Sequence, residues 1–126
     1  MIKRRDQSRH DSMVKSIAEY LTHNGHSNIK ADNIGYELHT LICWENTIKA
    51  HIPDITSFND TQYIFEIETD DSILDSHTED QWKLFSENAQ QDSKKFIVVV
   101  PKGYEWQARA RAKRIGATIT DVWTVD

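Results

Sequence analysis

The chain has 126 residues, of which 38% are hydrophobic and 28% are charged, and its formal net charge at pH 7 is −5. This length suits one hydrophobic core, and no apolar run approaches the roughly 20 residues of a membrane span, so we expect one domain over residues 1–126 and no membrane partner. The lone cysteine, Cys43, excludes an intrachain disulfide, and residues 1–13 lack the apolar segment of a secretion signal, so a cytoplasmic protein is expected.

An amphipathic helix is the first predicted element. Asp11 or Ser12 can cap its start, and Asn24-Gly25 ends it. Its apolar stripe follows the spacing i, i+3, i+4, i+7 and consists of Val14, Ile17, Ala18 and Leu21. Residues 1–10 are then expected to form a basic, partly flexible N-terminal arm.

Strands are predicted in the next part of the chain. Short strands are indicated at residues 28–32 and 41–44, and a longer one at residues 49–56. Residues 57–62 have the composition of a turn that leads into a strand over residues 62–69. In that strand the side chains alternate, so one face carries Tyr63, Phe65 and Ile67 and the other carries Ile64, Glu66 and Glu68.

The second half of the chain predicts two helices, each followed by a strand. Possible capping boxes begin at Ser76 and Thr78, ahead of a stripe formed by Trp82, Phe85 and Ala89. Residues 94–101 contain a continuous apolar run that is typical of a central strand. A basic helix ending at Gly116 and a strand over residues 117–125 complete the chain, and the helix is expected to bury Tyr104, Ala108, Ala112 and Ile115. The fold class is therefore α/β, with a mixed central sheet flanked by helices.

Charge is distributed unevenly along the sequence. Residues 54–92 contain eleven acidic residues and one basic residue, Lys83. The first fifteen residues and residues 102–114 contain five basic residues each. A polyanion held by the basic ends, near a cation held by the acidic middle, is one interpretation, and ordinary charged helix surfaces are the other.

Three acidic side chains are expected to converge on one face of the sheet. If residues 49–56 and 62–69 pair as a hairpin, Asp54 lies near Glu66 and Glu68. Carboxylates this close raise each other's pKa values unless a cation neutralises them, and oxygen ligands favour Mg²⁺ or Mn²⁺. An edge strand with one wet face would instead leave ordinary solvated glutamates there.

The pattern Pro53-Asp54, then about a dozen residues, then Glu66-Ile67-Glu68 on a hydrophobic strand resembles the signature of the PD-(D/E)xK nuclease superfamily. The predicted element order is similar to the αβββαβ core of that superfamily, the restriction-endonuclease-like fold, with a final helix and strand added. The resemblance covers essentially the whole chain and implies metal-dependent hydrolysis of phosphodiester bonds in nucleic acid.

The resemblance implies a role for each matching residue. Asp54, Glu66 and the Ile67 carbonyl would ligate Mg²⁺ or Mn²⁺. Gln81 would be a secondary site residue, because family members often place a glutamine on this helix; simple helix capping is its alternative role.

Glu68 departs from the family pattern, because it occupies the position of the family's lysine. A glutamate cannot supply positive charge, but it can accept a proton from water or ligate a second metal. Lys83, on the following helix, is a possible substitute for the missing lysine, although a solvent-facing lysine is the preferred interpretation. An inactive copy of the enzyme is the remaining possibility.

Nucleic acid, with DNA favoured over RNA, is the partner that the resemblance implies, and phosphate contacts would dominate its binding. The residues expected to bind it are Arg4, Arg5, Arg9, Lys102, Arg109, Arg111 and Arg114. Trp44, Trp106 and Trp123 are predicted to lie in the core rather than to stack on bases. No element resembles a major-groove reader, so weakly sequence-specific cleavage is expected, and a homodimer is possible because cutting two strands needs two sites.

Two alternatives belong to different functional classes. One is a non-catalytic module that keeps the nuclease fold and binds nucleic acid or a protein. The other is a small acidic metal-binding domain without nucleic acid affinity.

Overall fold

The structure, a computed structural model, describes residues 7–31, 42–43 and 50–126. Three helices are present in these residues: α1 (Gln7–His23), α2 (Ser76–Gln91) and α3 (Glu105–Ile115). The strands are β1 (Ser27–Ala31), β2 (Ile42–Cys43), β3 (Ala50–His51), β4 (Ile55–Asn59), β5 (Thr61–Ile67), β6 (Lys95–Pro101) and β7 (Asp121–Val125). Within the described ranges, no helix is both long and apolar enough to cross a membrane.

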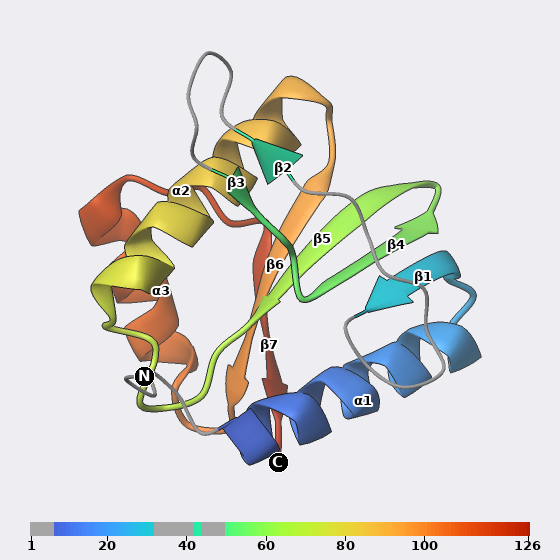
Figure 1. Ribbon diagram of the computed structural model, residues 1–126, viewed down its shortest axis with the longest axis horizontal. Coiled ribbons are helices and arrows are strands. Elements are labelled where there is room, and N and C mark those ends of the chain that lie inside the picture. The colour runs from blue at the N-terminus through green and yellow to red at the C-terminus, as the bar shows by residue number, and fades with distance from the viewer. Residues whose placement is uncertain (1–6, 32–41, 44–49) are drawn as a thin grey trace.

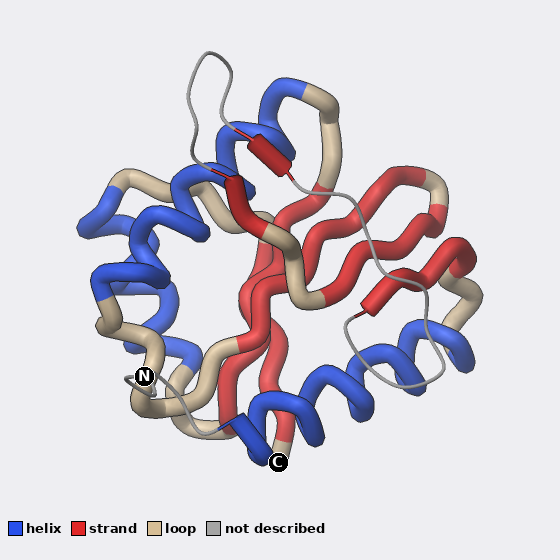
Figure 2. Tube along the Cα trace, viewed as in Figure 1, coloured by secondary structure: helices blue, strands red, loops and turns tan. Residues whose placement is uncertain are grey.

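A mixed five-stranded sheet lies at the centre of the molecule (Figure 1), with strand order β1-β4-β5-β6-β7. The β1-β4 and β4-β5 pairs are antiparallel, whereas the β5-β6 and β6-β7 pairs are parallel. Figure 2 shows helices on both sides of the strands, with α1 on one side and α2 and α3 on the other. Strands β2 and β3 form a separate two-stranded sheet. The predicted α/β class with a mixed sheet between helices is confirmed.

Two apolar layers hold the helices to the sheet. The layer under α1 contains the predicted stripe of that helix together with Phe65 and Ile67 of β5. The layer under α2 and α3 contains Ile64, Trp82 and Phe85. Strand β5 therefore alternates between the two layers as predicted, because successive side chains of a strand point to opposite faces.

Helix α1 begins four residues earlier than the proposed cap at Asp11. His10 and Met13 are buried and extend the apolar stripe of the helix by one turn, so the added turn gains packing against the sheet. Asp11 is an ordinary helical residue and accepts a hydrogen bond from Gln7 Nε2 at 2.8 Å. Residues 7–10, which the sequence assigned to an arm, thus belong to the helix, and residues 1–6 lie outside the described part of the chain.

The expected strand over residues 49–56 is wrong. Strand β3 ends at His51 and β4 starts at Ile55, with Pro53 between them; proline has no backbone N–H to donate to a sheet. The residues expected to form a turn instead extend β4 to Asn59, and the chain reverses at Asp60, whose φ of 64° is left-handed. The break before Ile55 frees the backbone around Asp54 from the strand.

The start of α2 is also corrected. Asp75 is its N-cap and accepts a hydrogen bond from the His77 N–H at 2.8 Å, in place of the boxes proposed at Ser76 and Thr78. The hydroxyl of Thr78 donates instead to the Ser72 carbonyl at 2.7 Å. At the other end of the chain, α3 stops at Gly116 with φ of 78°, as predicted, and β7 is shorter than the expected strand.

Candidate functional site

The three acidic residues singled out in the sequence come together where β4 begins and β5 ends. Ile55 pairs with Phe65, so Asp54 lies beside Glu66 in the hairpin register, and Glu68 follows the last residue of β5. Their exposed fractions are 9%, 0% and 1% for Asp54, Glu66 and Glu68. Burial of three carboxylates excludes the interpretation of an edge strand with solvated glutamates.

Asp54 is held between the hairpin and the first helix. Its Oδ2 accepts a hydrogen bond from the Ile67 N–H at 2.8 Å. Its Oδ1 lies 3.1 Å from Nε2 of His10, which is 4% exposed and belongs to the first turn of α1. Asp54 therefore has a fixed orientation, and it links α1 to the end of β5.

His10 is a site residue that the sequence reasoning missed. It precedes Met13 and Val14 by three and four residues, so it continues the apolar stripe of α1 toward the N-terminus. Its assignment to a flexible arm hid this spacing. The spacing of His10 from Met13 and Val14 could have shown that this histidine is buried on α1.

Glu68 is anchored by two neutral donors. The Ser72 hydroxyl donates to Oε1 at 2.6 Å, and the Trp82 indole N–H donates to Oε2 at 3.0 Å. The backbone N–H of Glu68 donates to the Val99 carbonyl at 2.9 Å, which extends the pairing of β5 with β6 by one residue. Such donors stabilise a buried carboxylate without adding a positive charge.

The connection between β5 and α2 supports this arrangement. Ser72 accepts a hydrogen bond from the Thr69 N–H at 3.1 Å, so its hydroxyl is directed toward Glu68 by the turn itself. The Thr69 hydroxyl contacts Oδ1 of Asp71. Thr69 and Ser72 are both buried, and the strand predicted over residues 62–69 ends two residues earlier, so Thr69 belongs to the turn. Trp82 was correctly placed in the core, but its hydrogen bond to Glu68 was not foreseen.

Lys83 and Gln81, the two predicted site residues on α2, differ in their surroundings. Lys83 Nζ lies 3.0 Å from Glu79 Oε2 in an i, i+4 ion pair at the surface, so it matches the preferred interpretation of a solvent-facing lysine. Gln81 is half-buried on the same helix, next to Trp82. His51 and His77 face each other nearby, with ring centroids 5.3 Å apart.

The basic residues proposed to bind nucleic acid fall into three groups. Arg9, Lys102, Arg109 and Arg114 are exposed. Arg111 is only 11% exposed; its Nη2 lies 3.6 Å from Glu79 Oε1 and 3.5 Å from the Asp75 carbonyl, so it joins α3 to α2 rather than facing solvent. Arg4 and Arg5 lie outside the described residues.

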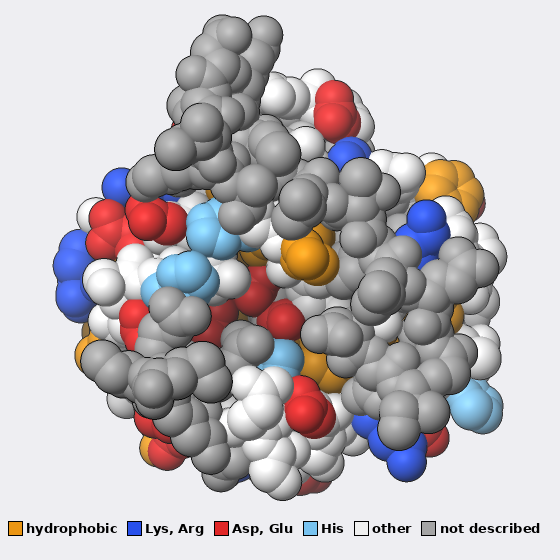
Figure 3. All heavy atoms as spheres, in the orientation of Figure 1, with side chains coloured by type: hydrophobic (Ala, Val, Ile, Leu, Met, Phe, Trp, Pro, Cys, Tyr) orange, Lys and Arg blue, Asp and Glu red, His pale blue; other side chains and the backbone are white. Residues whose placement is uncertain are grey.

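Acidic and histidine side chains gather near the middle of the face in Figure 3, whereas Lys and Arg side chains lie toward its margins. Among the described residues, no group of three or more His, Cys, Asp or Glu side chains is arranged to hold a metal. Magnesium commonly binds through one or two carboxylates and completes its shell with water and substrate phosphate. Asp54 and Glu66 are two carboxylates at adjacent positions of the β4-β5 hairpin register.

Comparison of the chain with family models, curated proteins and solved structures finds no match in any of the three. Function is therefore inferred from the positions of Asp54, Glu66 and Glu68 and from the residues around them.

Proposed function

We propose that this protein is a metal-dependent nuclease of the PD-(D/E)xK type. The observation that carries the proposal is the adjacency of two buried carboxylates: Asp54, just before β4, lies beside Glu66 of β5. The Ile67 N–H fixes Asp54, and Glu68 follows Glu66 by two residues. The strand arrangement supports it. When the separate β2-β3 sheet, which lies between β1 and β4 in the chain, is left aside, α1, β1, β4, β5, α2 and β6 have the αβββαβ order, with β5 and β6 parallel. Helix α3 and strand β7 are then the added pair.

Asp54 and Glu66 would hold the metal, and a bound Mg²⁺ supplies Lewis-acid stabilisation of the phosphate charge. The Ile67 N–H contacts one oxygen of the Asp54 carboxylate and His10 contacts the other, so Asp54 would present its carboxylate to the metal in a fixed orientation. In the structure, Ile67 orients Asp54 through its backbone N–H. Its carbonyl would in addition be a ligand of the metal. Glu66 is inaccessible from bulk water, which suits a carboxylate that acts on an ion rather than on solvent.

Glu68 would accept the proton of the attacking water. The Ser72 hydroxyl donates to one oxygen of its carboxylate and the Trp82 indole N–H to the other, so the side chain is held in one orientation. Both donors are neutral, and a carboxylate fixed in position can serve as a general base in its ionised form. Glu68 would thus take over water activation from the usual lysine, without the positive charge that lysine brings to the phosphate.

A second candidate is a non-catalytic module that retains the nuclease fold and binds nucleic acid or a protein. The observation in its favour is that Glu68 makes structural hydrogen bonds to Trp82 and Ser72 at the position of the family's lysine. A buried carboxylate that closes the turn before α2 can be kept for folding alone. In that case Asp54 and Glu66 would bind metal weakly or not at all.

The decisive experiment measures cleavage of single-stranded, duplex and branched DNA, and of RNA, with Mg²⁺ or Mn²⁺. Asp54→Ala and Glu66→Ala are compared with the natural protein, and Glu87→Ala, an exposed acid on α2, is the matched control. We expect both site variants to reduce cleavage by at least about a hundredfold and the control to leave it unchanged. Cleavage that survives both site substitutions would show a wrong site or a contaminant.

Metal titration and DNA binding separate the alternatives. Salt-dependent DNA binding without cleavage under any metal condition would select the non-catalytic module. Metal binding without nucleic acid affinity would select an acidic metal-binding domain. If cleavage is observed, Glu68→Gln should abolish it while metal binding persists, because glutamine keeps the shape of the side chain but cannot act as a base.

A further inference from the structure

Helix α3 presents an exposed tryptophan in a basic surface. Trp106 is 77% exposed, more than any other large hydrophobic side chain among the described residues. The prediction that it belongs to the core is wrong. Ala108 and Ala112 fill the buried side of α3, and the helical period places Trp106 on the opposite side.

Exposed cationic side chains lie on the same helix as this tryptophan and just before it. Arg109 and Lys113 follow it by three and seven residues, so they lie on the same side of the helix, and both are exposed. Lys102 precedes the helix and Arg114 lies near its end, and both are exposed as well. The α3 surface, defined as Lys102, Trp106, Arg109, Lys113 and Arg114, is strongly basic in a chain whose net charge is −5.

Two acidic side chains adjoin the α3 surface. Glu105 accepts a hydrogen bond from the Gly103 N–H at 3.1 Å, and Asp121 pairs with Arg109 at 2.9 Å. Both Arg109 and Asp121 are about half exposed, so this pair is weak and can exchange for a phosphate contact. The surface therefore keeps a clear positive excess.

We propose that the α3 surface binds unpaired nucleotides, with the Trp106 indole stacked on a base and the flanking lysines and arginines on phosphates. A base in a duplex hides both of its π-faces, so an exposed indole selects single-stranded segments, bulges or ends. The cations add the salt-dependent attraction that any polyanion provides. This inference rests on the proposed nuclease function, and it narrows the substrate to nucleic acid that contains unpaired positions.

The location of the surface relative to the acidic site supports the inference. Helices α2 and α3 cover the same face of the sheet (Figure 1), and Arg111 connects them through Glu79 and Asp75. Trp82, on α2, donates to Glu68. A nucleic acid strand bound across α3 would thus lie on the same side of the sheet as Glu66 and Glu68. The basic residues of the α3 surface are themselves separate from these acidic residues.

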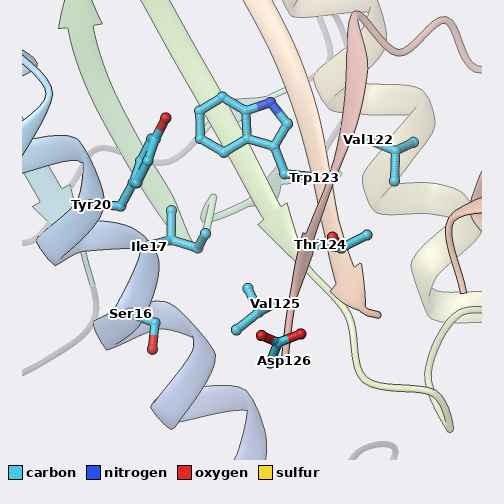
Figure 4. Close-up of a pocket in the computed structure, with 8 residues that line it drawn as sticks. All are labelled: Ser16, Ile17, Tyr20, Val122, Trp123, Thr124, Val125 and Asp126. Carbon is cyan, nitrogen blue, oxygen red and sulfur yellow. The ribbon is translucent and has the colours of Figure 1, made fainter. Parts of the chain in front are cut away.

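A second exposed aromatic provides a matched control. Figure 4 shows Tyr20 of α1 beside Trp123 of β7, in an open groove of about 730 Å³ between these two elements. Tyr20 is 53% exposed, and its ring meets that of Trp123 edge-on at 5.6 Å. The charged side chain among the residues that line this groove is Asp126, so the groove is not expected to attract phosphates.

The test is fluorescence anisotropy with labelled single-stranded and duplex oligonucleotides of equal length, in EDTA so that no cleavage occurs. We expect Trp106→Ala to weaken single-strand binding by about tenfold or more, as loss of one stacked base predicts, and duplex binding by less than about twofold. Trp106→Phe should retain part of the affinity. Lys113→Ala should weaken both single-strand and duplex binding and should make the affinity less dependent on salt concentration. Tyr20→Ala should change neither affinity.

The outcomes distinguish this inference from the nuclease proposal. Unchanged single-strand affinity in Trp106→Ala, or equal losses for single strand and duplex, would overturn the stacking role even if the protein cleaves DNA. A natural protein that binds no oligonucleotide would overturn both proposals. Loss of a protein contact or of self-association in Trp106→Ala, with DNA binding intact, would assign the tryptophan to a protein interface instead. Circular dichroism of each variant confirms that folding is unaffected.

Discussion

The two faces of strand β5 are equally buried but chemically different. Toward α1 the strand presents Phe65 and Ile67, which pack in a cluster of buried apolar side chains. Toward α2 it presents Ile64 and then Glu66 and Glu68, so apolar packing gives way to carboxylates along one strand. Burial of an apolar side chain stabilises the fold, whereas burial of a carboxylate opposes folding unless hydrogen bonds or a cation compensate.

This contrast indicates why the carboxylate face is a candidate site. Glu68 receives two hydrogen bonds from side chains that the fold positions specifically for it, and Asp54 receives one from the backbone of β5. Hydrogen bonds of this kind offset the free-energy cost of burying a carboxylate, and their net contribution to stability is small. Both faces therefore contribute apolar packing, and buried carboxylates interrupt that packing only on the α2 face.

The largest expected effect tests the apolar face. Phe65→Ala should lower the free energy of unfolding by about 3–5 kcal/mol, because it removes a fully buried ring and leaves a cavity. Phe58→Ala, on the neighbouring strand β4, removes a ring that is 42% exposed and should cost less than half as much. Urea denaturation of both variants measures the difference, and equal losses would contradict the assignment of the core to this face.

The next effect tests the polar face through Trp82. Trp82→Phe keeps an aromatic ring but removes the N–H that donates to Glu68, so we expect a loss of about 1–3 kcal/mol in the free energy of unfolding. Trp106→Phe makes the same chemical change on the exposed side of α3 and should be neutral. Thermal and urea denaturation compare the pair. If Trp82→Phe were as mild as its control, the indole hydrogen bond would not stabilise Glu68.

A smaller change, with the opposite sign, is expected at Glu66. Glu66→Gln removes a charge from a fully buried position at nearly constant volume, so stability should stay the same or rise by about 1 kcal/mol. Cleavage activity should nevertheless disappear, because a neutral amide is a poor ligand for Mg²⁺. Glu87→Gln, on the exposed side of α2, should alter neither quantity. A clear loss of stability in Glu66→Gln would assign this carboxylate a structural role.

The sequence predicted the parts of this contrast that depend on local periodicity. Alternation placed Phe65 and Ile67 opposite Glu66 and Glu68, and the i, i+3, i+4, i+7 spacing identified the buried stripe of α1, because each pattern follows directly from strand or helix geometry. The C-cap at Gly116 was found for the same reason, since a left-handed residue that ends a helix favours glycine.

The sequence did not predict contacts between distant elements. The hydrogen bonds from Trp82 and Ser72 to Glu68 depend on how the turn after β5 closes, and the approach of His10 to Asp54 depends on where α1 starts. Trp106 was misplaced for a different reason: its size was taken as a sign of a core position, although the helical period already put it opposite Ala108 and Ala112.

The smallest expected effect concerns a titratable group at the margin of the apolar face. His26 Nδ1 lies 2.8 Å from the buried Ser57 hydroxyl, and its ring meets Tyr63 edge-on at 4.8 Å. Burial lowers the pKa of His26 below its usual value of about 6.5, because the charged imidazolium loses hydration.

The sign of the pH effect follows from this shift. The unfolded chain binds a proton near pH 6.5, whereas the folded chain binds it only at lower pH, so the contribution of His26 to stability is complete above pH 6.5 and is lost as the pH falls toward the folded pKa. Urea denaturation between pH 7.5 and 5 should therefore show a decrease in stability that His26→Gln makes shallower. An identical slope in the natural protein and in His26→Gln would show that protonation of His26 does not oppose packing against Tyr63.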